Sequence, residues 1–180
     1  HEITASQRIM IAIDRQAQDR QVEETRARVA TAVAAVIDAA QDAGANHPYL
    51  VDKNVKPHGI QQVGADLVIP IIDINGNLMT KKTIAPDGTK RYAKGGAKKG
   101  GMYQIGKIKG YIQVAEGFAT AASIYEATGN ACFVCFDAGG IGPVVDALRS
   151  KYDLPIVICA DNDQWTAGNP GVTTAQEVAA

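Results

Sequence analysis

The sequence predicts an α/β protein: a long N-terminal helix, a small antiparallel β region, and then a mainly parallel sheet flanked by helices. Three observations lead to this prediction. Apolar residues recur at helical spacing over residues 5–44, an Asn-Gly turn separates two apolar runs near residue 75, and strand and helix patterns alternate from residue 111 onward. Such alternation is typical of parallel strands joined by right-handed crossovers.

The first expected element is the long helix over residues 5–44. Its apolar residues recur at steps of three and four, which places them along a helical face. They are Ile9, Ala12, Ile13, Val22, Val29, Val33, Val36, Ile37 and Ala40. Gly44 is a natural stop signal. We assign residues 1–46 to a helical segment whose charged middle, residues 14–28, is either a solvated face or a surface for a partner protein.

The next region, residues 47–110, is expected to form a small, mostly antiparallel sheet. Residues 66–72 and 78–84 have the character of strands, and the stretch D-I-N-G-N between them contains Asn75-Gly76. An Asn-Gly pair between apolar runs is a strong signal for a β-hairpin. A second turn at Asp87-Gly88 introduces a further short strand.

Charge is unevenly distributed along the chain. The net charge is −1, with 46% hydrophobic and 21% charged residues, so binding of nucleic acid through overall charge is excluded. A local basic patch is not excluded, because residues 81–109 contain nine Lys or Arg and a single acidic residue, Asp87. No apolar run approaches the ~20 residues that span a bilayer, and we expect a cytoplasmic protein without a membrane partner.

From residue 111 the chain alternates between strands and helices. Strands are expected over residues 111–115, 131–136 and 155–160, and helices over 118–128, 142–151 and 173–180. We therefore assign residues 111–180 to an α/β domain, with its boundary near Gly110. The chain starts at His1 rather than Met and stops within the last expected helix, so we expect it to be an excised domain of a longer protein.

Three carboxylates follow these expected strands directly. Glu116 comes after the first strand, and Asp161 and Asp163 come after the last. Side chains beyond the carboxyl ends of parallel strands point into the crevice where ligands bind. The alternative interpretations are a helix-start carboxylate for Glu116 and a turn or N-cap for the two aspartates. Since clustered carboxylates repel one another unless a cation lies between them, their joint placement predicts a magnesium site and phosphate chemistry.

A basic loop forms the second candidate site. Its cations are Lys90, Arg91, Lys94, Lys98 and Lys99, which surround Gly95-Gly96 and Gly100-Gly101. Glycine lets backbone amides approach a phosphate closely, and lysine neutralises its charge. The spacing differs from that of a P-loop. The loop is thus either a contact for the phosphates of a template or nucleotide, or a solvated hairpin tip.

Two further features receive structural interpretations. Cys132 and Cys135 form a C-x-x-C, but they lie inside an apolar run, and no second Cys/His pair completes a zinc site. We expect both to be buried strand residues. Trp165, two residues beyond Asp163, is expected to be buried against the sheet, with capping of the site or stacking on a base as alternatives.

These motifs resemble a known family. The stretch E-G-F-A-T-A-A-S-I (116–124) after one strand and D-N-D (161–163) after a later one resemble the Toprim domain of bacterial-type primases, topoisomerases and some nucleases. The sequences of residues 47–59, 86–100 and 136–140 are similar to those of primases of phages and plasmids, which are often fused to a helicase. The resemblance covers residues 47–180.

The resemblance implies the catalytic core of a DNA primase, a nucleotidyltransferase that makes short RNA primers on single-stranded DNA. It implies Mg²⁺ as cofactor, or Mn²⁺ in its place, held by Glu116, Asp161 and Asp163. Asp137 departs from the pattern of the best-known bacterial primases and is either an added metal ligand or a turn residue. The implied partners are the single-stranded template, ribonucleoside triphosphates and a replicative helicase domain in the same or a partner chain. The implied source is a bacterium, phage, prophage or plasmid.

Two other functions stay open from the sequence. A Toprim nuclease would use the same metals to hydrolyse nucleic acid, and a non-catalytic module would bind nucleic acid or dock a helicase through residues 5–44. A topoisomerase is disfavoured because no separate domain with a nucleophilic tyrosine is present in these residues.

Overall fold

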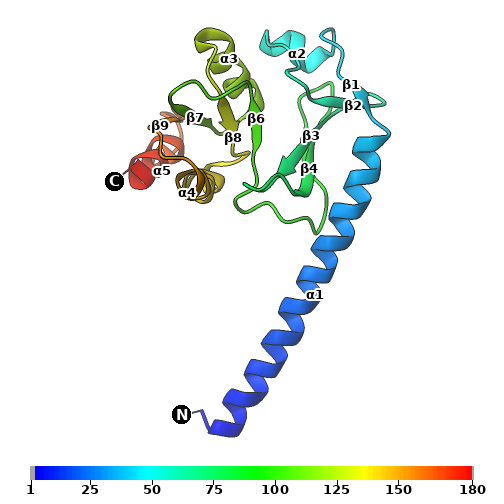
Figure 1. The fold of residues 1–180 in the computed structure, drawn as a ribbon, viewed down its shortest axis with the longest axis vertical. Helices are drawn as coiled ribbons and strands as arrows, with labels where there is room; N and C mark the ends of the chain where they lie inside the picture. Colours follow the sequence, from blue (N-terminus) through cyan, green and yellow to red (C-terminus); the bar gives the residue numbers. More distant parts are fainter. Residues whose placement is uncertain (1–2, 180) are drawn as a thin grey trace.

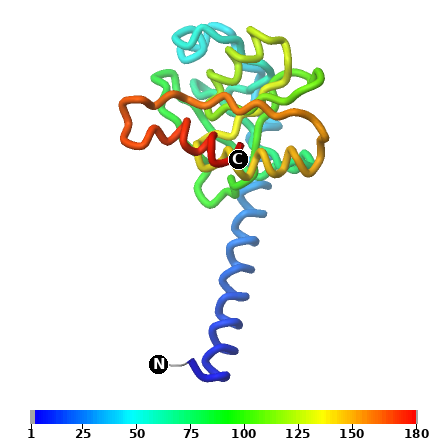
Figure 2. The backbone as a smooth tube through the Cα atoms, turned by 90° about the vertical axis from the view of Figure 1, so that its left-hand side faces the viewer, coloured from blue at the N-terminus to red at the C-terminus, as the bar shows by residue number. Residues whose placement is uncertain are grey.

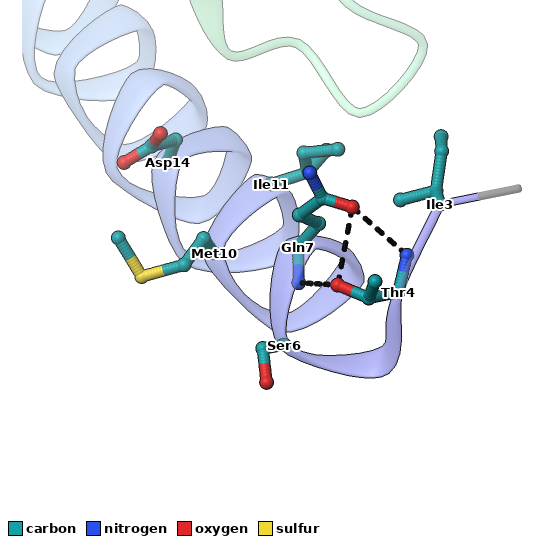
Figure 3. A pocket seen from close by; sticks show the side chains of 7 residues that line it. All are labelled: Ile3, Thr4, Ser6, Gln7, Met10, Ile11 and Asp14. Carbon is teal, nitrogen blue, oxygen red and sulfur yellow. Dashed lines mark hydrogen bonds between the residues drawn. The ribbon is translucent and has the colours of Figure 1, made fainter. Parts of the chain in front are cut away.

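A single long helix, α1 (Ala5–Asp38), extends away from the rest of the chain in the structure, a computed structural model that describes residues 3–179 (Figure 1). Thr4 begins the helix with a capping box, in which Thr4 Oγ1 accepts from the Gln7 amide and Gln7 Oε1 accepts from the Thr4 amide at 2.9 Å (Figure 3). The surface hollow there is lined only by residues between 3 and 14, at the start of α1 and just before it. Ile9, Met10, Ile11 and Ile13 are exposed, so the first half of α1 packs on nothing among the described residues.

Helix α1 ends at Asp38 rather than near Gly44, so the predicted helix was too long. The reason is a long-range strand pairing, since residues 41 and 42 pair with a strand some twenty residues later. The side chain of Gln61 donates to the carbonyl of Ile37 at 3.1 Å and satisfies one of the unpaired carbonyls at the helix end. The second half of α1 packs against β4.

The first sheet is antiparallel, and its five strands pair in chain order. They are β1 (Gln41–Asp42), β2 (Gln61–Val63), β3 (Asp66–Ile72), β4 (Leu78–Ile84) and β5 (Lys90–Tyr92). The predicted hairpin is confirmed as β3 and β4, and the Asp73 carboxylate closes its turn by accepting from the amides of Asn75 and Asn77 at 2.8 Å each. Helix α2 (Pro48–Lys53) was not predicted.

The second sheet contains the alternating α/β region, with strand order β6-β8-β7-β9. Its strands are β6 (Tyr103–Ile105), β7 (Ile112–Ala115), β8 (Cys132–Val134) and β9 (Ile156–Cys159). Its helices are α3 (Phe118–Thr128), the 3₁₀ turn η1 (Ala138–Gly140), α4 (Ile141–Lys151) and α5 (Pro170–Ala179). As predicted, β7 is parallel to β8 and to β9; β6, which precedes residue 110, adds an antiparallel edge strand.

One hydrophobic core joins the two sheets. Ile69 and Ile71 of β3 are fully buried in the same cluster as Ala121 and Ala122 of α3 and Val134 of β8. A second cluster lies between β7, β8 and α4. The first sheet and α3 therefore pack on one face of the second sheet, and α4 packs on the other.

The cysteines are structural, as expected. Cys132 and Cys135 are buried and unpaired, and the Cys135 thiol donates to the carbonyl of Ala115 at 3.2 Å. Burial raises the pKa of both thiols to about 12, so they stay protonated.

Hydrogen bonds connect the segment before β2 to helix α3. One carboxylate oxygen of Glu126 accepts from the Lys56 amide at 2.9 Å and lies 2.6 Å from His58 Nε2. The His58 ring meets Tyr125 edge-on, and the hydroxyl of Tyr103 donates to the His58 carbonyl at 2.8 Å. These contacts connect residues more than 40 positions apart and hold the two sheets in one orientation.

The Glu126→Gln variant is expected to be less stable than wild type at neutral pH, with a smaller difference in acid. The pKa of Glu126 lies below its ordinary value of 4.5, because the Lys56 amide and the His58 ring donate hydrogen bonds to the carboxylate. A carboxyl group whose pKa falls on folding adds stability above its ordinary pKa, and that stability is lost as the pH falls through the native pKa. Urea unfolding at about pH 7 and about pH 3 measures both differences; equal differences would mean that the charge of Glu126 adds nothing.

No helix in the described part of the chain combines the length and the apolar character that crossing a membrane requires.

Candidate active site

The predicted carboxylates lie at one edge of the second sheet. Because β7, β8 and β9 are parallel, their carboxyl ends meet there. Glu116 follows β7, and Asp161 follows β9, its neighbour on one side. Asp137 follows β8, the neighbour on the other side. The topology thus puts Glu116 between two aspartate-bearing strand ends.

The carboxylates affect one another electrostatically. Glu116 is half-buried, and this burial raises its pKa above the ordinary value of 4.5. The negative charges of Asp161, Asp163 and Asp137 raise the pKa further, in that order of size, while Lys82 opposes them. Within residues 3–179, no three His, Cys, Asp or Glu side chains converge closely enough to hold a metal ion as they stand. The four carboxylates form a repulsive cluster whose charge a cation would relieve.

The Asp137 carboxylate has two hydrogen-bond partners, one in β5 and one in the loop that follows β5. Its Oδ2 accepts from Lys98 Nζ at 2.8 Å and from the Tyr92 hydroxyl at 3.1 Å. Burial tends to raise the pKa of Asp137, but the hydrogen bond and charge of Lys98 and the Tyr92 hydroxyl hold it below its ordinary value of 3.8. The basic loop therefore reaches the acidic cluster through Lys98.

A cavity of about 310 Å³ opens beside these carboxylates. Its lining combines Glu116 and Asp161 with the lysines Lys53, Lys82 and Lys90. Residues 117–120 at the start of α3, together with apolar side chains, complete the wall. Acidic and basic side chains from both sheets thus surround one space, which suits an anionic ligand accompanied by a cation.

Lys82 is a site residue that the sequence analysis did not name. Its Nζ donates to the Phe136 carbonyl at 2.8 Å and lies 4.8 Å from the centre of the Tyr92 ring. Burial and the nearby charge of Lys90 lower the pKa of Lys82. The alternation of β4 places Lys82 on the face of Thr80 and Ile84, which are fully buried, but its partner Phe136, 54 residues away, leaves no local signal in the sequence.

Phe136 has an unusual backbone at this edge. Its φ of 73° lies in the left-handed region, which costs a bulky residue about 1–3 kcal/mol. This conformation directs the Phe136 carbonyl toward Lys82 Nζ and the Tyr92 hydroxyl, and it precedes Asp137 in the chain. The turn at Phe136 therefore positions both Lys82, through the hydrogen bond to the Phe136 carbonyl, and Asp137, the next residue.

The structure places the basic loop only partly at the cavity. Lys90 lines the cavity and Lys98 contacts Asp137, whereas Arg91, Lys94 and Lys99 are exposed outside the lining. The loop glycines pack closely against the sheet: a Cβ atom on Gly96 would overlap Thr80, and one on Gly101 would overlap Ile71. Close packing accounts for these two glycines without a bound phosphate.

The D-N-D segment is held by the start of α5. A Cβ atom on Gly171 would overlap the Asp161 carbonyl oxygen and would lie 3.2 Å from Asp163 Oδ2. Only glycine therefore allows α5 to approach the two aspartates this closely. Trp165, between Asp163 and α5, is 92% exposed, so the expectation that it is buried was wrong. The loop turns outside the sheet, which leaves the indole without a surface to pack on.

Known proteins similar to this chain were found by sequence and by structure. Two curated proteins named DNA primase TraC, both from Escherichia coli, are 37% and 33% identical to the chain over 175 residues. Each alignment covers 90% of the chain, which spans only 16% and 12% of the length of these relatives. No protein-family model matches the chain.

Among solved structures, the primase fragment of the bacteriophage T7 primase-helicase protein covers 72% of this chain and 59% of its own chain, with a TM-score of 0.53 and 18% identity. A bacteriophage T7 lagging-strand DNA polymerase structure, which includes primase domains bound to an RNA/DNA hybrid and dTTP, gives a TM-score of 0.51 at 17% identity, over 72% of this chain and 71% of that one. At such identities the likeness concerns the fold. By sequence, the chain is a homologue of one segment of the DNA primases named TraC.

Proposed function

We propose that this chain is the catalytic core of a DNA primase, with a Toprim-type site that joins ribonucleotides on a single-stranded DNA template. The observation that carries the proposal is the juxtaposition of a carboxylate cluster at adjacent parallel strand ends with a lysine-lined cavity. The similarity to a segment of named DNA primases supports the same function.

In this proposal Glu116, Asp161 and Asp163 hold Mg²⁺, or Mn²⁺ in its place, with Asp137 as the candidate fourth ligand. The donor chemistry fits, because carboxylate oxygens are the ligands that hard divalent cations prefer. Convergence on an ion requires rotation of side chains on strand ends that are already neighbours. When bound, the metal supplies activation of the attacking 3′-hydroxyl and stabilisation of the leaving pyrophosphate.

The lysines of the cavity orient the phosphates of the incoming nucleotide. Lys82 and Lys90 face the same space as Glu116, so they neutralise phosphate charge next to the carboxylates. Lys98 provides a third cation, held at the cluster by Asp137. Lysines and carboxylates on either side of the triphosphate align the α-phosphate for attack. Because the triphosphate is already held in position, the reaction loses little further translational and rotational entropy.

The exposed cations of the loop bind the phosphates of the template strand. They are Arg91, Lys94 and Lys99. Contacts with phosphates give affinity without reading sequence. The proposed partners are therefore single-stranded DNA and ribonucleoside triphosphates. A replicative helicase, in the same or a partner chain, is the third proposed partner, because a solved protein of similar fold is a primase-helicase.

Incubation of the chain with labelled ribonucleotides, a single-stranded DNA template and Mg²⁺ tests the proposal. Template-dependent RNA products of a few nucleotides are expected. Cleavage of the strand without primer synthesis would instead identify a nuclease that uses the same carboxylates. Binding without either reaction would point to a non-catalytic module.

Replacing Arg91, Lys94 and Lys99 together with alanine is expected to weaken binding of single-stranded DNA and to flatten its salt dependence. The slope of log affinity against log salt falls by about 0.7 for each phosphate that the variant no longer neutralises. Titration of a fluorescent oligonucleotide at several salt concentrations measures the slope. The matched control removes the same charge from α1 through alanine at Arg8, Arg15 and Arg20, and equal losses in both variants would exclude a specific role for the loop.

A further inference from the structure

Trp165 is the single tryptophan of the chain, and its side chain is almost entirely in water, at 92% exposure. Tryptophan is normally among the more buried residue types, because its large ring gains most from leaving water. The other large apolar residues exposed in the described chain reach at most 63%. Packing within the domain therefore does not explain this indole, whereas binding of a ligand would.

The indole is carried by a turn that is part of the acidic site. The amide of Thr166 donates to the carbonyl of Asp163 at 2.7 Å, and the amide of Asn169 donates to the carbonyl of Thr166 at 2.9 Å. The side chain of Asn169 also donates to that of Asn162, between the two aspartates, at 2.9 Å. Figure 2 shows this orange segment at the margin of the body, before the red helix α5. These hydrogen bonds therefore hold the turn that carries Trp165 next to Asp163.

The surroundings select the chemistry of the ligand. An indole on the turn that follows Asp161 and Asp163 offers a flat, neutral face, and such a face suits another neutral aromatic ring. Nucleobases have such faces, and stacking on an aromatic side chain accepts every base. The cations that would hold the attached phosphates, Lys82 and Lys90, line the cavity that Asp161 also lines.

We propose that Trp165 is a stacking platform for a nucleobase at the edge of the acidic site. This inference rests on the proposed primase function and adds to it the residue that receives a base. The base comes either from the single-stranded template or from the nucleotide, and the same indole chemistry serves both sources.

The single tryptophan makes the test direct. Intrinsic fluorescence of the chain is recorded during titration with oligo(dT), with ATP and Mg²⁺, and with an abasic strand of the same length as the oligo(dT). Stacking predicts quenching by at least one of the first two probes and none by the abasic strand. The probe that quenches identifies the source of the base.

Affinity measurements on variants complete the test. Trp165→Ala is expected to weaken binding of the quenching probe about 5- to 150-fold, while Trp165→Phe retains most of the affinity. Val157→Ala, on the exposed face of β9, controls for loss of an exposed apolar group and leaves affinity unchanged. Loss of affinity for the abasic strand equal to that for oligo(dT) would overturn the proposal, since bases would then play no part.

The outcomes separate this inference from the proposed function. If wild type makes primers while Trp165→Ala binds and primes like wild type, the platform is refuted and the primase function stands. If wild type makes no primer but its fluorescence responds to bases and not to the abasic strand, the platform stands and the primase function is refuted. Absence of any fluorescence response to either base-containing probe would overturn the platform.

Discussion

Changing Asp161 and Asp163 together to asparagine is expected to reduce primer synthesis about 1,000-fold, equivalent to about 4 kcal/mol of transition-state stabilisation. Asparagine keeps the size of each side chain but removes the two negative charges that would hold the metal. Because the cluster repels itself, removing charge is also expected to leave the fold intact or slightly stabilised. Primer yield at saturating Mg²⁺, together with thermal unfolding, measures both effects.

The matched control for this variant is Asp146→Asn with Asp153→Asn. Both residues are exposed in the same domain and lie in or after α4, before β9, so they remove equal charge away from the site. The control is expected to prime like wild type. Priming by the Asp161/Asp163 variant within a few-fold of the control would contradict the proposed active site.

Changing Gly171 to alanine is expected to have the second-largest effect. The added methyl group would overlap the Asp161 carbonyl oxygen, so the D-N-D segment or the start of α5 must move. Overpacking of this kind costs about 1–3 kcal/mol of stability. A shift of the aspartates by about 1 Å is expected to reduce primer synthesis about 100-fold. Urea unfolding and the primer assay measure the two losses separately.

Gly142→Ala provides the control for Gly171→Ala. Gly142 is the second residue of α4, and a Cβ atom there would make an ordinary contact of 3.4 Å with Val178. This variant is expected to be as active as wild type. An active Gly171→Ala protein with normal stability would show that the approach of α5 does not position the aspartates.

The α/β part of the fold was predictable because its signals are local. The alternation from residue 111 marked all three parallel strands, and helix α3 (Phe118–Thr128) matches its expected range. Parallel strands end at a common edge of the sheet, so the strand assignments predicted that Glu116 and Asp161 lie at the same edge, whereas the direct pairing of β7 with β9 came from the structure. The metal-binding role of these residues remains a prediction.

Other parts of the fold depend on partners distant in the sequence. The two-residue strand β1 exists only through its pairing with β2, and it ends α1 before the glycine signal is reached. Strand β6 is three residues long and is defined by its antiparallel pairing with β8. Segments this short carry no periodicity of their own, so sequence patterns alone do not identify them.

Distant partners also explain which contacts of the site the sequence did not predict. The contacts of Asp137 with Lys98 and Tyr92 cross from one sheet to the other, over separations of 39 and 45 residues. Asp137 therefore has a structural partner in addition to its candidate role as a metal ligand. Lys82 was hidden for a related reason, since its carbonyl partner on Phe136 lies 54 residues away.

Binding of Mn²⁺ to the chain, followed by electron paramagnetic resonance, tests the central claim most directly. Free Mn²⁺ gives a sharp signal that is lost on binding, so the measurement requires neither template nor activity. The proposed site predicts that wild type binds Mn²⁺, that Mg²⁺ displaces it, and that changing Asp161 and Asp163 to asparagine abolishes the binding. Equal binding of Mn²⁺ by this variant and wild type would contradict the claim that these carboxylates form the metal site.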